Sequence, residues 1–301
     1  MPDPARVLLS LAVAALLAPA AARAQAPTAD TAWLTSSHWD DGRAEVAFYE
    51  VHRSRNQYGR PDDQTFLVGT YLVKHEFDPA TRSKAAASAE GGVPAFKWAL
   101  FYEIESGSYQ YKRAYVTNAA QADLAPLKAS FTSFDWCSNL YREQDFLPDG
   151  RVESLVRSDD YGNRATSVAL SARAYPVAEL PLLVRGLDFS VQARQELRVV
   201  LLDGTTVEVT ATLEGRETVE TAAGRFETEK IVLRYASEVP SPVGEQADTI
   251  EHYWRATGEG RHLVRLAADG GRYSMELVET VRSPYWRENL FPDLERVRSR
   301  P

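Results

Sequence analysis

Apolar and polar residues alternate along most of this chain, and that alternation constrains its fold more than any other feature. Successive side chains of an extended strand point to opposite faces of a sheet, so an alternating segment is typical of a half-buried strand. The clearest such segments are 96–104, 206–213 and 272–277. Weaker alternation predicts further strands over 44–53, 65–77, 109–116, 128–143, 152–158, 166–172, 193–202, 226–235, 249–254 and 262–267.

Short turn sequences separate these segments. They are Ser106-Gly107, Asp149-Gly150, Asp203-Gly204, Ala223-Gly224 and Asp269-Gly270-Gly271. Asp-Gly and similar pairs supply the positive φ values that tight hairpins need. We therefore predict an all-β fold, an antiparallel meander curled into a barrel or an open clam. One short helical segment is expected over 178–187, where Pro181 limits its length.

The N-terminal residues have the three-part pattern of a cleavable secretory signal. Arg6 precedes an apolar run over 7–17, Pro19 breaks that run, and Ala22-Arg23-Ala24 supplies small residues for a signal peptidase. The run is shorter than the ~20 residues of a membrane-spanning helix. We expect 1–24 to be a signal peptide and the mature protein to be periplasmic or secreted. Without a cysteine at the cleavage site, no lipid anchor is expected.

The mature chain is long enough for one large β-rich domain, and a single domain is expected over 25–301. Two halves of it could join near 175–188. No later apolar stretch is long enough to predict a transmembrane segment. The lone cysteine, Cys137, has no partner for an internal disulfide and is interpreted as a small buried hydrophobe.

Charge and motifs argue against several classes of function. The net charge is −8, from 34 Lys and Arg against 42 Asp and Glu, whereas nucleic-acid binding needs a basic face. The five histidines show no i,i+4 pair, and neither Gly-x-Ser-x-Gly nor a phosphate-binding loop occurs. The oxygen-rich segment 159–163 lacks calcium-loop spacing and is interpreted as a hairpin turn. No nucleic acid, metal or cofactor is expected.

One cluster could support acid–base chemistry. His38 is followed by Trp39, Asp40, Asp41 and Gly42. A hydrolytic role for His38 with the two aspartates is one interpretation. The other is a turn into the next strand, with Trp39 packed in the core. Enzymatic activity stays open, with a non-catalytic protein favoured.

Two stretches carry a family resemblance. The first comprises 38–46 (HWDDGRAEV), 57–59 (QYG), 74–77 (KHEF) and 135–141 (DWCSNLY); the second comprises 217–231 (ETVETAAGRFETEKI), 253–254 (YW) and 260–265 (GRHLVR). Both resemble exported bacterial β-rich proteins of unknown function, some of which are labelled septum formation inhibitor. The resemblance implies export and an all-β fold, and it brings no catalytic residues. That label describes a cytoplasmic nucleotide pyrophosphatase, which the signal peptide and the strand pattern contradict.

Aromatic residues crowd two neighbouring predicted strands, and they supply the candidate ligand-binding set of Trp98, Tyr102, Tyr109, Tyr111, Arg113 and Tyr115. Arg113 interrupts an otherwise aromatic face, and a buried arginine needs a partner. If both strands turn these residues inward, they would line a cavity for an amphiphile with an anionic head. If the tyrosines point outward, they form an ordinary solvated face with Arg113 stacked on them.

Three functions follow from these alternatives. The first is an envelope protein that binds an apolar or amphiphilic small molecule without catalysis, marked by a large apolar cavity with a few polar groups. The second is a structural or protein-interaction module of the cell envelope, marked by an exposed apolar patch. The third is a hydrolase, marked by a cleft with shifted pKa values.

Overall fold

A computed structural model describes residues 26–57, 60–86, 91–106, 109–136, 138–242, 247–290 and 297. The expected signal peptide, 1–24, and Cys137 lie outside the described residues. Strands make up 64% of the structure and helices 8%, so the all-β prediction is confirmed.

The described strands form one sheet. Its first half comprises β1 (Ala44–Gln57), β2 (Arg60–Asp78), β3 (Ser83–Lys84), β4 (Val93–Ser106), β5 (Tyr109–Ala120), β6 (Pro126–Phe134), β7 (Asn139–Phe146), β8 (Arg151–Ser158) and β9 (Arg164–Ala169). Its second half comprises β10 (Tyr175–Pro176), β11 (Arg194–Val200), β12 (Thr206–Thr221), β13 (Gly224–Pro240), β14 (Ala247–Ala256), β15 (Leu263–Ala268) and β16 (Tyr273–Ser283).

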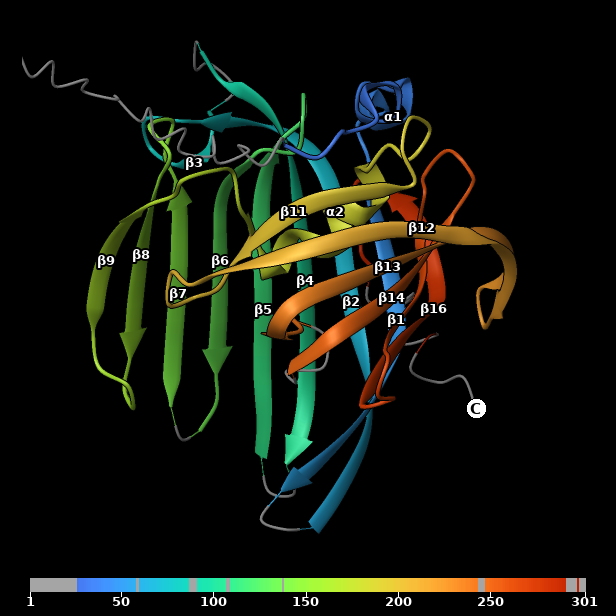
Figure 1. The fold of residues 1–301 in the computed structure, drawn as a ribbon. Helices are drawn as coiled ribbons and strands as arrows, with labels where there is room; N and C mark the ends of the chain where they lie inside the picture. Colours follow the sequence, from blue (N-terminus) through green and yellow to red (C-terminus); the bar gives the residue numbers. More distant parts are fainter. Residues whose placement is uncertain are drawn as a thin grey trace, which may run out of the picture.

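The sheet is a meander whose first and last long strands meet. Most consecutive strands pair antiparallel, although β3 pairs only with β2, and β2 pairs with β4. Strand β1 also pairs antiparallel with β16, which joins the two halves. The short strand β10 pairs parallel with β11 and forms one edge, while β9 forms the other. Because β9 and β10 do not pair, the sheet stays open. In Figure 1, β11 to β14 cross in front of the green and cyan strands of the first half, as the two shells of a clam would.

A short helical segment fills the space between the shells. The 3-10 turn η2 (Val177–Glu179) leads into helix α2 (Leu180–Gly186), close to the 178–187 predicted. Every residue of α2 is buried, and Pro181 stands in its first turn, where a missing N–H costs nothing. Leu182 and Val184 pack in one core with the inward residues of both shells.

The end of α2 is held by a charged side chain. Arg255 of β14 donates hydrogen bonds from Nη1 to the carbonyl oxygens of Val184 (2.9 Å), Arg185 (3.1 Å) and Leu187 (2.7 Å). These are carbonyls that a helix end leaves without intrahelical partners, and a cation is favourable there. Its Nη2 also donates to Glu229 (2.8 Å).

The N-terminal segment packs against the top of the clam. It forms α1 (Thr31–Leu34) and the 3-10 turn η1 (Ser37–Asp40). Trp33 and Trp39 are both buried, with ring centroids 5.2 Å apart. Among the described residues, no helix is long and apolar enough to cross a membrane.

The strand predicted over 128–143 is wrong in one respect. The chain forms two strands there, β6 and β7, and it reverses direction between them. Asp135 stabilises this reversal by accepting a hydrogen bond from the Ser138 amide (2.9 Å). A short strand, β3, also occurs within the loop expected over 79–92.

Candidate ligand cavity

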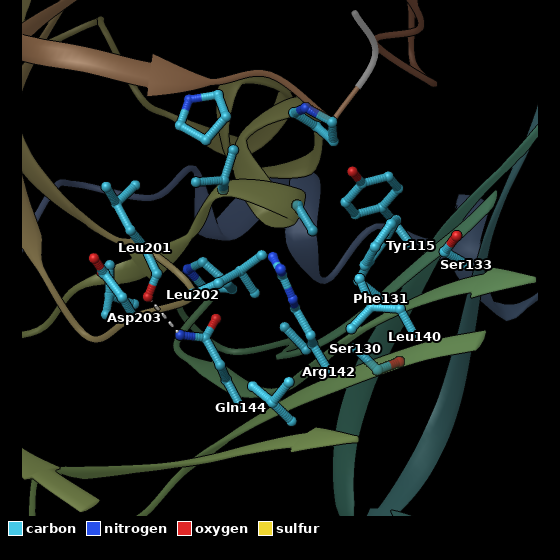
Figure 2. Close-up of a pocket in the computed structure, with 18 of the residues that line it drawn as sticks. Tyr115, Ser130, Phe131, Ser133, Leu140, Arg142, Gln144, Leu201, Leu202 and Asp203 are labelled. Carbon is cyan, nitrogen blue, oxygen red and sulfur yellow. Dashed lines mark hydrogen bonds between the residues drawn. The ribbon is translucent and has the colours of Figure 1, made fainter. Parts of the chain in front are cut away.

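A cavity of about 670 Å³ lies between the two shells. Its floor is the concave face of β5 to β8 (Figure 2). Its opposite wall is formed by Pro176–Ala178, by the turn between β11 and β12, and by Pro240–Pro242. Tyr161 and Arg164 complete the lining, and both are exposed, as are Asp203 and Pro240 of the opposite wall, so the cavity is open to solvent.

Strand register explains which side chains reach the floor. Cross-strand partners share a face, and one row of partners runs across β4 to β9 through Leu100, Tyr115, Phe131, Arg142, Val156 and Arg164. A parallel row contains Tyr102, Arg113, Ser133, Leu140 and Ser158. The concave face is therefore aliphatic and aromatic at β4 and gains polar groups toward β9.

Arg113 is held in place by three neighbours. Its guanidinium lies 4.9 Å from the ring centroid of Tyr111 and donates a hydrogen bond to Ser133. Nη1 also lies 3.7 Å from a carboxylate oxygen of Asp135. The predicted stacking of Arg113 on tyrosine is thus present, and an acidic partner is added to it.

Arg142 is differently placed. It projects from β7 into the cavity, flanked in the register by Phe131 and Val156 (Figure 2). Its Nε is buried and has no hydrogen-bond partner among the described residues. No described carboxylate lies within ion-pair distance of it. Sequence reasoning did not select this residue.

Gln144 connects the two walls of the cavity. Its side-chain Nε2 donates a hydrogen bond to the carbonyl oxygen of Leu201 (2.9 Å), drawn as a dashed line in Figure 2. Gln144 is on β7 and Leu201 is at the start of the turn between β11 and β12. This hydrogen bond therefore bridges the two shells beside the cavity.

The residues predicted from sequence fall into three environments. Arg113 and Tyr115 line the cavity, where the rings of Tyr115 and Phe131 lie 4.5 Å apart. Trp98 and Tyr102 are buried in the core, and the Tyr102 hydroxyl donates to the carbonyl of Pro242 (3.4 Å). The two aromatic rows do adjoin, since Tyr102 pairs with Arg113.

The remaining two tyrosines lie near the end of β5. The hydroxyls of Tyr109 and Tyr111 are 2.9 Å apart. Tyr111 packs against the core, whereas Tyr109 stacks with exposed Trp136, 6.4 Å between centroids, in a separate surface hollow. Neither tyrosine lines the cavity itself.

The His38 cluster has the arrangement of a packed turn. Asp40 forms an ion pair with Lys74 (2.6 Å), and Asp41 pairs with Arg282, while Trp39 is buried. Burial and the nearby Arg282 both lower the pKa of His38. Within the described ranges, no three His, Cys, Asp or Glu side chains converge as metal ligands.

A buried acid stands behind the opposite wall. Glu179 of η2 is completely buried, and its Oε2 accepts a hydrogen bond from Thr117 (3.3 Å). Its Oε1 has no hydrogen-bond partner in the part of the chain that is described. Burial raises the pKa of Glu179 well above its usual range, against the smaller opposing effects of Thr117 and Arg173.

Solved structures similar to the chain include two proteins. One is a β-barrel-like protein of domain of unknown function DUF1849 from Brucella abortus, with 9% identity, a TM-score of 0.47, and coverage of 80% of this chain and 98% of that one. The other is a protein with a YmcC-like fold from Bacteroides fragilis, with 12% identity, a TM-score of 0.25, and coverage of 79% and 95%. No protein-family model and no curated protein sequence matches the chain.

Proposed function

We propose that this chain is an exported, non-catalytic protein that binds an apolar or amphiphilic small molecule in the cavity between its shells. The cavity is the observation that carries the proposal. Its volume of about 670 Å³ falls within the ~300–1,000 Å³ typical of small-molecule sites. It also sets a few polar groups, such as Arg142 and Gln144, among mainly apolar walls.

The residues predicted from sequence take different roles in this proposal. Arg113 and Tyr115 would contact the ligand, because both line the cavity. Trp98 and Tyr102 would support the floor of the cavity from the core. Tyr109 and Tyr111 would not contact the ligand, because neither lines the cavity.

Export is part of the same proposal. It rests on the signal pattern of residues 1–24, and it places the ligand in the periplasm or outside the cell. N-terminal sequencing of the exported protein should find a start near Gln25. A start that retains the apolar run over 7–17 would contradict export by a cleaved signal.

Ligand binding can be tested by filling the cavity. Leu140→Trp adds bulk on the floor, whereas Thr132→Trp places the same side chain at an exposed position on the opposite face of β6. A fluorescent fatty acid and a neutral fluorescent lipid analogue would be titrated into each protein. We expect saturable binding by the wild type and Thr132→Trp, and weaker binding by Leu140→Trp. Absence of binding by the wild type would contradict the proposal.

A protein-interaction role is the second candidate, and it rests on the outer face. Phe101 and Phe134 are 41% and 59% exposed there, beside Phe48 and Leu67 in a hollow of about 400 Å³. Exposed aromatic patches often mark interaction surfaces. If this function holds, Phe134→Ser should abolish association with the partner or with a second copy, while leaving small-molecule binding unchanged.

A further inference from the structure

Two fully buried arginines of this fold pair with carboxylates. Arg185 lies 2.8 Å from Glu45, and Arg255 lies 2.8 Å from Glu229. Pairing is expected, because a buried charge without a partner costs far more than a paired one. Arg142 has no acidic partner in the described structure, although its Nε is buried without a hydrogen bond. Arg142 is only half-buried, so its guanidinium lies in the cavity lining with no acidic partner among the described residues.

The other charges around the cavity do not compensate for Arg142. Asp203 is the acidic residue in the lining, and its Oδ1 accepts a hydrogen bond from the Thr205 amide (2.9 Å) of its own turn. Asp135 lies beside Arg113 instead. With Arg164 exposed at the opening, the cavity carries an excess of positive charge.

The surroundings of Arg142 are apolar on one side. Phe131 and Tyr115 continue its row toward β4, and Val177 and Ala178 face them from the opposite wall. A guanidinium at the end of an aromatic and aliphatic surface suits a molecule with an acidic head and an apolar tail. The planar fork of arginine binds carboxylate or phosphate oxygens with two parallel hydrogen bonds.

Resting on the proposed function, we infer that the ligand is an anionic amphiphile whose carboxylate or phosphate head binds Arg142. Its tail lies along Tyr115, Phe131 and the η2 wall. Arg113 then has a positioning role, because Asp135, Ser133 and Tyr111 already hold its guanidinium. The inference thus assigns the anionic head to Arg142, whereas the sequence suggested Arg113.

The test compares heads on a constant tail. Laurate, dodecyl phosphate, dodecanol and inorganic phosphate would each compete with a neutral fluorescent lipid analogue for the wild type, Arg142→Met and Arg157→Met. Arg157 is the matched control because it is exposed on the opposite face of the neighbouring strand β8. Methionine keeps an unbranched apolar stem without the charge.

We expect the wild type and Arg157→Met to bind laurate or dodecyl phosphate about tenfold or more tightly than dodecanol, as a charge-assisted hydrogen bond provides. Preference for one acid over the other identifies the head. Arg142→Met should bind acids and alcohol equally. Retained preference in Arg142→Met, or none in the wild type, would overturn the inference while leaving cavity binding intact. Inorganic phosphate as strong as dodecyl phosphate would overturn the amphiphile class. If no amphiphile displaces the probe, the proposed function itself fails.

Thermal unfolding supplies a second readout. Because Arg142 has no described partner to lose, Arg142→Met should unfold at the same temperature as the wild type or higher. A structural ion-pair role would instead lower the unfolding temperature, and that result would count against a ligand-binding role for Arg142.

Discussion

The guanidinium of Arg185 lies 2.8 Å from the carboxylate of Glu45, and both side chains are about 3% exposed. Arg185 belongs to α2 and Glu45 to β1, so this ion pair ties the helix inside the clam to the wall around it. His262 of the loop before β15 lies 3.1 Å from the same carboxylate. Burial disfavours the charged carboxylate, but Arg185 and His262 outweigh it and hold the pKa of Glu45 far below its usual range.

Glu45→Gln should destabilise the fold by about 3–5 kcal/mol near neutral pH, because it leaves Arg185 charged and unpaired in the core. A lowered folded-state pKa means that the ionised Glu45 contributes its stability above its unfolded pKa of about 4.3. That contribution is lost as the pH falls further. Urea unfolding at several pH values should therefore show a difference in the free energy of unfolding between wild type and variant, and that difference should narrow below about pH 5.

The control is Glu50→Gln on the same strand. The Glu50 side chain is about half exposed and pairs with His52 (2.9 Å), so its removal should cost about 1 kcal/mol or less. The role of this ion pair would be contradicted if Glu45→Gln lowered the free energy of unfolding as little as Glu50→Gln does. It would also be contradicted if the loss stayed constant with pH.

Arg255 should matter as much as Glu45 for holding α2. Arg255→Met leaves the carbonyl oxygens of Val184 and Leu187 and the Oε2 atom of Glu229 without this donor. We expect a loss of about 3–5 kcal/mol. Arg234→Met removes an exposed arginine that pairs with Glu214 (3.2 Å) and should cost about 1 kcal/mol or less. Equal denaturant midpoints for the two variants would show that Arg255 does not anchor the helix.

The sheet could be predicted from local pattern because its signals are local. Alternation over 96–104 places Trp98 and Leu100 inward, and both are buried. Positive φ at Gly150 (84°) and Gly204 (88°) provides the turns that were expected there. Each of these features depends on a few neighbouring residues, which a single sequence displays.

Arg142 could not be predicted, because the chain reversal between β6 and β7 changes which residues face inward. In β6 the odd-numbered residues Phe131 and Ser133 face the cavity, whereas in β7 the even-numbered Arg142 and Gln144 do. A continuous strand over 128–143 would place Arg142 on the outer face with Phe134. The opposite wall, including Leu201, comes from distant sequence, which alternation does not reveal.

Glu179 should make the protein less stable as the pH rises. Its folded-state pKa is raised by burial, so the folded protein keeps a proton that the unfolded chain releases above about pH 4.3. Glu179→Gln removes that penalty and keeps the hydrogen-bonding capacity toward Thr117. The variant should match the wild type near pH 4 and unfold at a higher temperature at pH 7 and 8. A variant that is less stable at pH 8 would indicate an ionised, paired Glu179.

Photolabelling locates the ligand and so tests the central claim most directly. A fatty acid with a photoreactive group in its tail would be irradiated with the protein, and the labelled residues would be identified by mass spectrometry. The account predicts saturable labelling around Tyr115, Phe131 and Val177, which falls in Leu140→Trp but not in Thr132→Trp. Labelling centred on Phe101 and Phe134 of the outer face, or labelling that Leu140→Trp leaves unchanged, would contradict binding in the cavity between the shells.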